Sequence, residues 1–120
     1  MQNEKKFGDF IAERRYAKGI TVRRMAEMIG ISPSHYNDME RRRRNPPDSD
    51  ILNRLIDALG LFGEDKLEFF DLVGRARSAV SPDLPEYIMS NDEVRVALRI
   101  AKEKATPEDW QRFIKQLENK

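Results

Sequence analysis

The chain has 120 residues, of which 39% are hydrophobic and 36% charged, so it is long enough for one small domain with an appendage and a modest core. It has no cysteine, which excludes disulfides and thiolate metal sites and favours a reducing, cytoplasmic setting. No apolar run approaches the roughly 18 residues of a membrane helix. The first residues lead into no apolar stretch of the kind a signal peptide has. We therefore expect no membrane partner.

Charge is unevenly distributed along the sequence. The net charge is +1, but residues 1–47 hold 11 Lys and Arg against 6 Asp and Glu, whereas residues 48–120 hold 11 against 15. A basic segment joined to an acidic one is typical of a protein whose basic part contacts a polyanion.

No stretch shows a convincing period-2 pattern, so the sequence predicts an all-α protein of about seven helical segments. Capping residues, glycines and prolines mark where the helices begin and end. Met25, Met28 and Met39 recur at helical spacing and are predicted core residues. Five helices are predicted in the N-terminal part: one over residues 7–18, one from the cap Thr21 to Gly30, one after the cap Ser32, one from Asp48 or Ser49 to Gly60, and one over residues 64–77.

The C-terminal part is predicted to be a short helical extension. Residues 81–85 (Ser-Pro-Asp-Leu-Pro) have the composition of a linker, which gives domains over 1–80 and 81–120. Ser90 with Glu93, and Thr106 with Asp109, have the spacing of capping boxes that open two short helices. The last helix places four apolar residues on one face, which is either core or a surface for a partner or a second subunit: Trp110, Phe113, Ile114 and Leu117.

The most informative stretch is residues 19–46, GITVRRMAEMIGISPSHYNDMERRRRNP. It has the pattern of a short helix, a turn and a second short helix. Ala26 is small where the two helices cross, Gly30 permits the turn, and Ile31 is apolar after it. Such a pair exposes the start of its second helix, so that side chains there can enter the major groove of DNA.

Over residues 7–60 the chain resembles the phage-repressor-like (Cro/repressor, xenobiotic-response-element-type) family of helix-turn-helix transcriptional regulators. The resemblance implies a five-helix bundle that forms a homodimer on a two-fold operator, with Arg15 and Glu40 as a structural pair between the first and third helices. It is carried by Ala26, Gly30, the cap Ser32, Tyr36, Met39, Glu40, Asn45 and Pro46, together with Arg15.

Positions carried over from the family give candidates for contact with double-stranded DNA. Asn37 suits adenine and Ser34 can read base edges, whereas Pro33 can make only apolar contact. His35 is either a contact or an ordinary surface residue, and the run of four arginines is either a phosphate-binding segment or a solvated loop. The base-reading candidates are Pro33, Ser34, His35 and Asn37, and the phosphate candidates are Thr21, Arg23, Arg41, Arg43 and Arg44.

Three positions depart from the family pattern. Val22 stands where a glutamine commonly touches the DNA backbone, Arg42 where a glycine follows the glutamate, and Arg14 where leucine is usual. These departures bear on the docking to DNA more than on the fold.

No catalytic or metal-binding pattern is present. The sequence lacks a glycine-rich phosphate loop, a Ser-His-Asp set and any metal-ligand spacing, and its lone histidine, His35, has no second ligand. We therefore predict that the protein is not an enzyme and has no catalytic residue, cofactor or metal.

The sequence as a whole predicts a cytoplasmic transcription regulator of the repressor type that binds a palindromic operator as a homodimer. Two alternatives stay open: an antitoxin whose residues 84–120 bind a partner protein, and an adaptor whose helix-turn-helix is scaffold and reads no DNA. The predicted dimer or partner surface comprises Phe69, Phe70, Trp110, Phe113 and Leu117.

Overall fold

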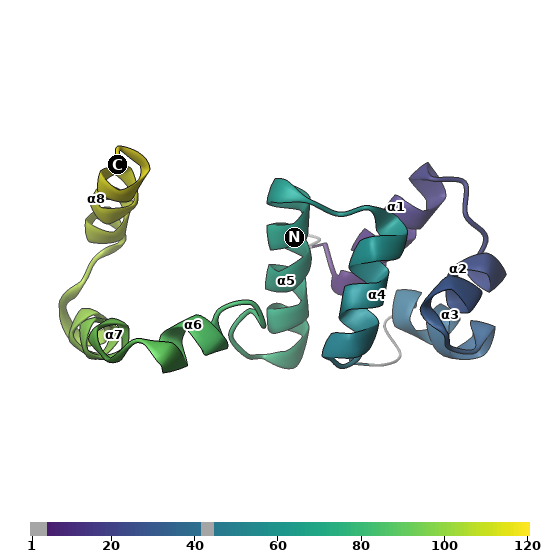
Figure 1. Cartoon of the computed structure of the whole chain (residues 1–120), viewed down its shortest axis with the longest axis horizontal. Coiled ribbons are helices and arrows are strands. Elements are labelled where there is room, and N and C mark those ends of the chain that lie inside the picture. The colour runs from purple at the N-terminus through teal and green to yellow at the C-terminus, as the bar shows by residue number, and fades with distance from the viewer. Residues whose placement is uncertain (1–4, 42–44) are drawn as a thin grey trace, which may run out of the picture. The chain divides into compact units, whose positions relative to one another are not determined.

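The computed structural model describes residues 5–41 and 45–120, and every regular element within them is a helix. The predicted fold class is confirmed: five helices form a bundle and a helical extension follows (Figure 1). Two units divide the chain, Met1–Pro82 and Asp83–Lys120. The helices are α1 (Phe7–Ala17), α2 (Val22–Ile29), α3 (Pro33–Glu40), α4 (Ser49–Leu59) and α5 (Gly63–Arg77) in the first unit, and α6 (Pro85–Ser90), α7 (Asp92–Lys104) and α8 (Pro107–Glu118) in the second.

Local signals place the helix ends in the first unit. The Thr21 and Ser32 hydroxyls accept the backbone N–H groups of Arg24 and His35, both at 3.0 Å, so each side chain satisfies a donor of the first helical turn. The Asp48 carboxylate does the same for α4. Gly30 and Gly60 end α2 and α4 in the left-handed conformation, with φ of 77° and 65°.

The first unit contains every buried hydrophobic residue of the described chain. Its centre is aromatic: the Phe69 ring lies 5.6 Å from that of Phe7 and 6.1 Å from that of Phe10, centroid to centroid. Burying one such side chain contributes roughly 1.5–3 kcal/mol. The bundle therefore holds α5 against α1 through a shared apolar centre.

Two predictions about the burial of individual side chains are wrong. Phe69 is 0% exposed, so it belongs to the core and not to a dimer or partner surface. Successive helical residues point about 100° apart, and Phe70 is the one left half-buried at the edge. Met28 is 39% exposed and is not core, because Met25, Ala26 and Ile29 occupy the inward face of α2.

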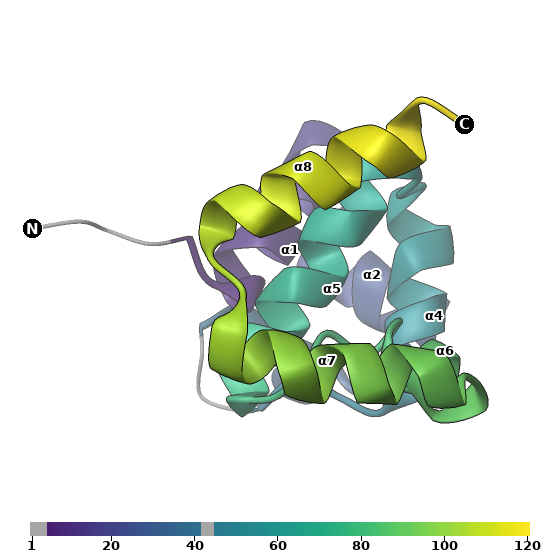
Figure 2. The same cartoon turned by 90° about the vertical axis from the view of Figure 1, so that its left-hand side faces the viewer.

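The second unit has helices but no buried residue. Helix α6 starts at Pro85, inside the predicted linker, and packs on α7. The prediction that Ser90 caps a helix is wrong: it is the last residue of α6, and its hydroxyl donates to the Glu86 carbonyl at 2.7 Å. The predicted Thr106–Asp109 capping box is present and opens α8. Helices α7 and α8 do not run alongside each other in either view (Figures 1 and 2).

None of the helices in the described residues is long and apolar enough to cross a membrane.

Candidate nucleic-acid interface

Helices α2 and α3 form a helix-turn-helix pair. They pack directly against each other, with Ala26 buried between them. After Gly30 the chain turns, and the Ile31 N–H donates back to the Ala26 carbonyl at 3.0 Å, which satisfies a carbonyl that the end of α2 would otherwise leave unpaired. The turn fixes where α3 begins and leaves its first residues at the surface of the unit.

The four base-reading candidates lie together on the first two turns of α3. Pro33 and Ser34 are exposed, while His35 and Asn37 are half-buried. The inward side of α3 is taken by other residues, since Tyr36 and Met39 are buried in the core. Pro33, Ser34 and Asn37 share one face through i, i+1 and i+4 spacing. This outward face is where a base edge would have to meet the helix.

The described phosphate candidates lie at the ends of α2 and α3. Thr21 is exposed at the start of α2, where its hydroxyl accepts the Arg24 N–H. Arg23 is exposed on the first turn of α2, and Arg41 is exposed at the end of α3. Arg43 and Arg44, and the departure at Arg42, lie outside the described residues.

A largely buried ion pair joins α1 to the end of α3. Arg15 Nε donates to Glu40 Oε2 at 2.6 Å and Nη2 donates to Oε1 at 3.1 Å, while Nη1 reaches the Ile20 carbonyl at 2.8 Å. The two side chains are only 13% and 9% exposed. The hydrogen bonds that Arg15 donates to Glu40 raise the pKa of Arg15, which stays charged. The expected pair is therefore present, with the two-pronged geometry that favours arginine over lysine.

The Tyr36 hydroxyl is buried beside this pair and has no hydrogen-bond partner within the described chain. Burial, and then the neighbouring Glu40 carboxylate, raise its pKa, so the group stays protonated. Tyr36 therefore acts as a core side chain, and its position on the inner face of α3 leaves the outer face to polar residues.

Two of the three departures from the family pattern have a structural account. Arg14, where leucine is usual, lays its guanidinium 4.7 Å from the centre of the Phe10 ring and bonds Asp65 at 3.0 and 3.2 Å. It thus covers the core as an apolar side chain would and ties α1 to α5 as well. Val22 is half-buried against the core and has no polar group to offer DNA.

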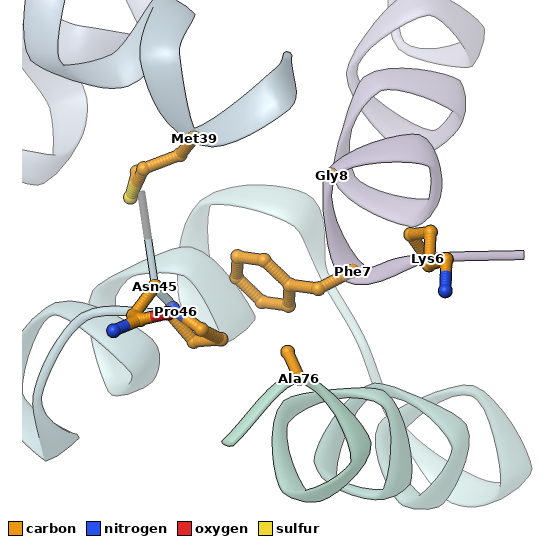
Figure 3. Close-up of a pocket in the computed structure, with 7 residues that line it drawn as sticks. All are labelled: Lys6, Phe7, Gly8, Met39, Asn45, Pro46 and Ala76. Atoms are coloured by element: carbon orange, nitrogen blue, oxygen red, sulfur yellow. The ribbon is translucent and has the colours of Figure 1, made fainter. Parts of the chain in front are cut away.

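A pocket of about 220 Å³ lies where α1, α3 and α5 meet (Figure 3). It contains none of the base-reading candidates, so it is separate from the outer face of α3. Among the described residues, no group of three or more His, Cys, Asp or Glu is placed to hold a metal. The pocket is lined by Lys6, Phe7, Gly8, Met39, Asn45, Pro46 and Ala76.

Sequence reasoning missed two residues that contact the helix-turn-helix pair. Gly8 lies against the backbone at the end of α3, and Arg54 of α4 donates to the Ile29 carbonyl at 3.2 Å. The sequence around Gly8 and Arg54 does not mark either residue as a contact of the helix-turn-helix pair. A glycine in a first helical turn and an arginine four residues after Asp50 are ordinary features of helices.

Comparison with known families gives a match to the family described as "Helix-turn-helix domain" over residues 6–70, more than half of the chain. The chain belongs to this helix-turn-helix family. The family is one of DNA-binding domains, and the matched residues run from the residue before α1 into α5, so they include the whole α2–α3 pair.

A similar solved structure is titled "SinR protein/SinI protein complex". It is 18% identical in sequence and has a TM-score of 0.46, over 93% of this chain and 94% of that one. The sequence matches none of the curated proteins with which it was compared.

Proposed function

We propose that the protein is a sequence-specific, DNA-binding transcriptional regulator that acts as a repressor. The observation that carries this is the outer face of α3. Polar residues stand at its exposed start, while Arg15 and Glu40 fasten its other end to α1. A rigid helix with a polar, solvent-facing start is what major-groove reading requires. Residues 1–80 are proposed as the DNA-binding domain.

Pro33, Ser34, His35 and Asn37 are proposed to face the bases. The operator can be found by selection from random oligonucleotides with the intact protein. We then expect Asn37→Ala to weaken binding to the selected site by about 1–3 kcal/mol, while binding to scrambled DNA changes little. Equal loss on both DNAs would make Asn37 a phosphate or fold residue. Recovery of no preferred sequence would remove the proposed function.

Thr21, Arg23, Arg41, Arg43 and Arg44 are proposed to contact phosphates. Each such contact adds about −0.9 to the slope of log affinity against log salt concentration. Replacing Arg43 and Arg44 by alanine should therefore weaken binding to all sequences alike and flatten that slope. A slope that does not change would remove these two arginines from the interface.

We propose that the protein binds as a homodimer and that residues 81–120 contribute to the contact. One recognition helix covers too few base pairs to select a site in a genome, and two copies on a palindrome solve this. The second unit supports the idea because Trp110 and Phe113 stay 39% and 47% exposed on one face of α8. With Phe69 buried, the remaining surface candidates are Phe70, Trp110, Phe113 and Leu117.

Sedimentation of the intact protein and of a truncation after Pro82 tests the dimer. We expect a dimer for the intact chain at tens of micromolar and a monomer for the truncation, which keeps the whole first unit. A monomeric intact chain would contradict dimerisation without DNA. An undiminished dimer after truncation would instead place the contact in the first unit.

The same exposed α8 face supports a second candidate, an antitoxin that covers residues 84–120 with a partner protein and regulates its own gene through α3. The two candidates differ in what occupies the face. The experiment adds the protein encoded by a neighbouring gene to the homodimer. A homodimer that stays intact and exchanges no subunit favours the repressor. A heteromer that forms at the expense of the homodimer, and that Phe113→Ala prevents, favours the antitoxin.

A further inference from the structure

The first turn of α1 lies directly on the end of α3. A Cβ atom built on Gly8 would come within 2.5 Å of the Glu40 carbonyl oxygen and 2.6 Å of the Met39 carbonyl oxygen. Figure 3 shows Gly8 on α1 beside the part of α3 that carries Met39. Both contacts are with backbone, which cannot swing aside as a flexible side chain can. Only glycine therefore permits this approach of the two helices.

The turn between α2 and α3, which precedes the other end of α3, is held by a residue of α4. Ile29 is the last residue of α2, and its carbonyl lies at the negative end of that helix. Arg54 of α4 donates Nη1 to this carbonyl at 3.2 Å. The same Nη1 lies 3.0 Å from where a Cβ on Gly30 would be, so the guanidinium rests on the turn itself. The contact ties α4 to the point from which α3 departs.

From these two contacts we infer that Gly8 and Arg54 are positioning residues that fix the direction of α3 from its two ends. A base-reading side chain must be held to within about 0.5 Å of its productive position. The Arg15–Glu40 pair joins side chains at the end of α3, whereas Gly8 contacts the backbone of that end and Arg54 contacts the turn that precedes the helix. The absence of a side chain at Gly8 sets how closely the end of α3 approaches α1. Arg54 fixes the position of the turn at Gly30, from which α3 begins. The inference rests on the proposed reading of DNA by α3.

The first test measures discrimination, the ratio of the dissociation constants for scrambled DNA and for the selected operator, well below the unfolding temperature. A change in stability alone scales both constants by the folded fraction and leaves their ratio unchanged. We expect Gly8→Ala and Arg54→Met each to lower the ratio about tenfold, the size of a lost base contact. Arg54→Lys, which keeps one donor for the Ile29 carbonyl, should recover part of it.

Each variant has a matched control. Gly63 begins α5 with φ of 58° and has no atom within 4 Å of a built Cβ, so Gly63→Ala costs stability without touching α3. Arg24 lines the same surface groove between α2 and α4 as Arg54, but its guanidinium bonds only Glu27 in the described chain. Arg24→Met therefore removes a charge at the same place. A drop in the ratio for the controls equal to that for the variants would overturn the inference.

A second test needs no DNA. Because the chain has no cysteine, spin labels can be placed through Ser34→Cys on α3 and Asn53→Cys on α4. We expect the distance distribution between them to shift or broaden in Gly8→Ala and Arg54→Met and to stay as it is in both controls. An unchanged distribution in Arg54→Met would overturn the inference even if Gly8→Ala failed to fold. If selection finds no operator, the proposed function falls while this measurement still decides whether the two residues position α3.

Discussion

The two units of the chain use the same helical signals but differ in what those signals build. Both have capped helices with apolar residues at helical spacing. In the first unit α1–α5 enclose a core, with side chains such as Phe10 and Phe69 fully buried. In the second, α6, α7 and α8 bury no residue, and Phe113 and Trp110 remain exposed. An amphipathic sequence pattern therefore predicts a helix. A core also requires that several helices pack with their apolar faces against one another.

This difference bears on stability. Isolated helices of fewer than about 12–15 residues are marginal in water, and tertiary burial supplies most of the stability of helices in proteins. Helices α6–α8 are 6, 13 and 12 residues long. We therefore expect the first unit to fold on its own core and the second, which buries no residue, to be less stable.

The largest expected effect contrasts two phenylalanines. Phe69→Ala removes a fully buried ring from the first unit and should lower its free energy of unfolding by about 3–5 kcal/mol, as measured by chemical denaturation. Phe113→Ala, a matched change on the exposed face of α8, should leave that transition in place. Equal losses for the two would show that α8 is part of the same core, and the contrast between the units would fail.

The second contrast uses the same chemistry at two degrees of burial. Arg15→Met leaves the largely buried Glu40 carboxylate without its partner, which should cost up to about 3 kcal/mol in the same denaturation experiment. Arg112, whose side chain is 70% exposed, pairs with Asp109 on α8. Arg112→Met should leave the unfolding transition unchanged, because solvent screens exposed pairs. A small loss for Arg15→Met would mean that water reaches the Glu40 carboxylate.

The sequence predicted the first unit well because its signals are local. The caps Thr21, Ser32 and Asp48 and the stops Gly30 and Gly60 stand within one turn of the helix ends that they define. The predicted pair of Arg15 and Glu40 came from the family pattern and not from spacing. What the sequence could not supply was the direction of individual side chains, since Phe69 and Phe70 have the same chemistry and only the packing of α5 on α1 decides which one is buried.

Long-range and marginal features were the ones missed. Gly8 owes its role to carbonyls more than thirty residues away, which no local pattern reveals. Helix α6 is only six residues long and begins at a proline within a stretch of linker composition. Ser90 has the spacing of a cap with Glu93, but it is the last residue of α6, and its hydroxyl donates to the Glu86 carbonyl one turn earlier.

The second unit can be studied alone, as a peptide, to ask whether its helices are stable without the first unit. A peptide of residues 83–120 should show weak helical circular dichroism at low micromolar concentration and a helical signal that rises with concentration, because association buries the α8 face. The peptide with Phe113→Ala should lose the concentration dependence. Strong helicity at every concentration would show that the unit is stable by itself, and weak helicity at every concentration would point to a different protein as the cover.

The smallest expected effect concerns the Thr106–Asp109 capping box that opens α8. The Thr106 N–H donates to the Asp109 carboxylate at 2.9 Å, and the Thr106 hydroxyl accepts the Asp109 N–H at 3.2 Å. These bonds, with a contribution from Arg112, lower the pKa of Asp109 below its ordinary value of 3.8. The folded helix thus binds this proton less tightly than the unfolded chain does.

The stabilisation of α8 by the Asp109 carboxylate is therefore complete above the ordinary pKa of Asp109. It is lost as the pH falls from about 3.8 through the lower pKa that Asp109 has in the folded protein. We expect the Cα chemical shifts of residues 107–110 in the intact protein to lose helical character over that range, before those in the middle of α8. Asp109→Asn keeps an acceptor for the Thr106 N–H but has no titrating group, so the same shifts should no longer respond there. A response that survives in Asp109→Asn would assign it to Glu108, the other acidic residue in the first turn, and would remove the capping box as its cause.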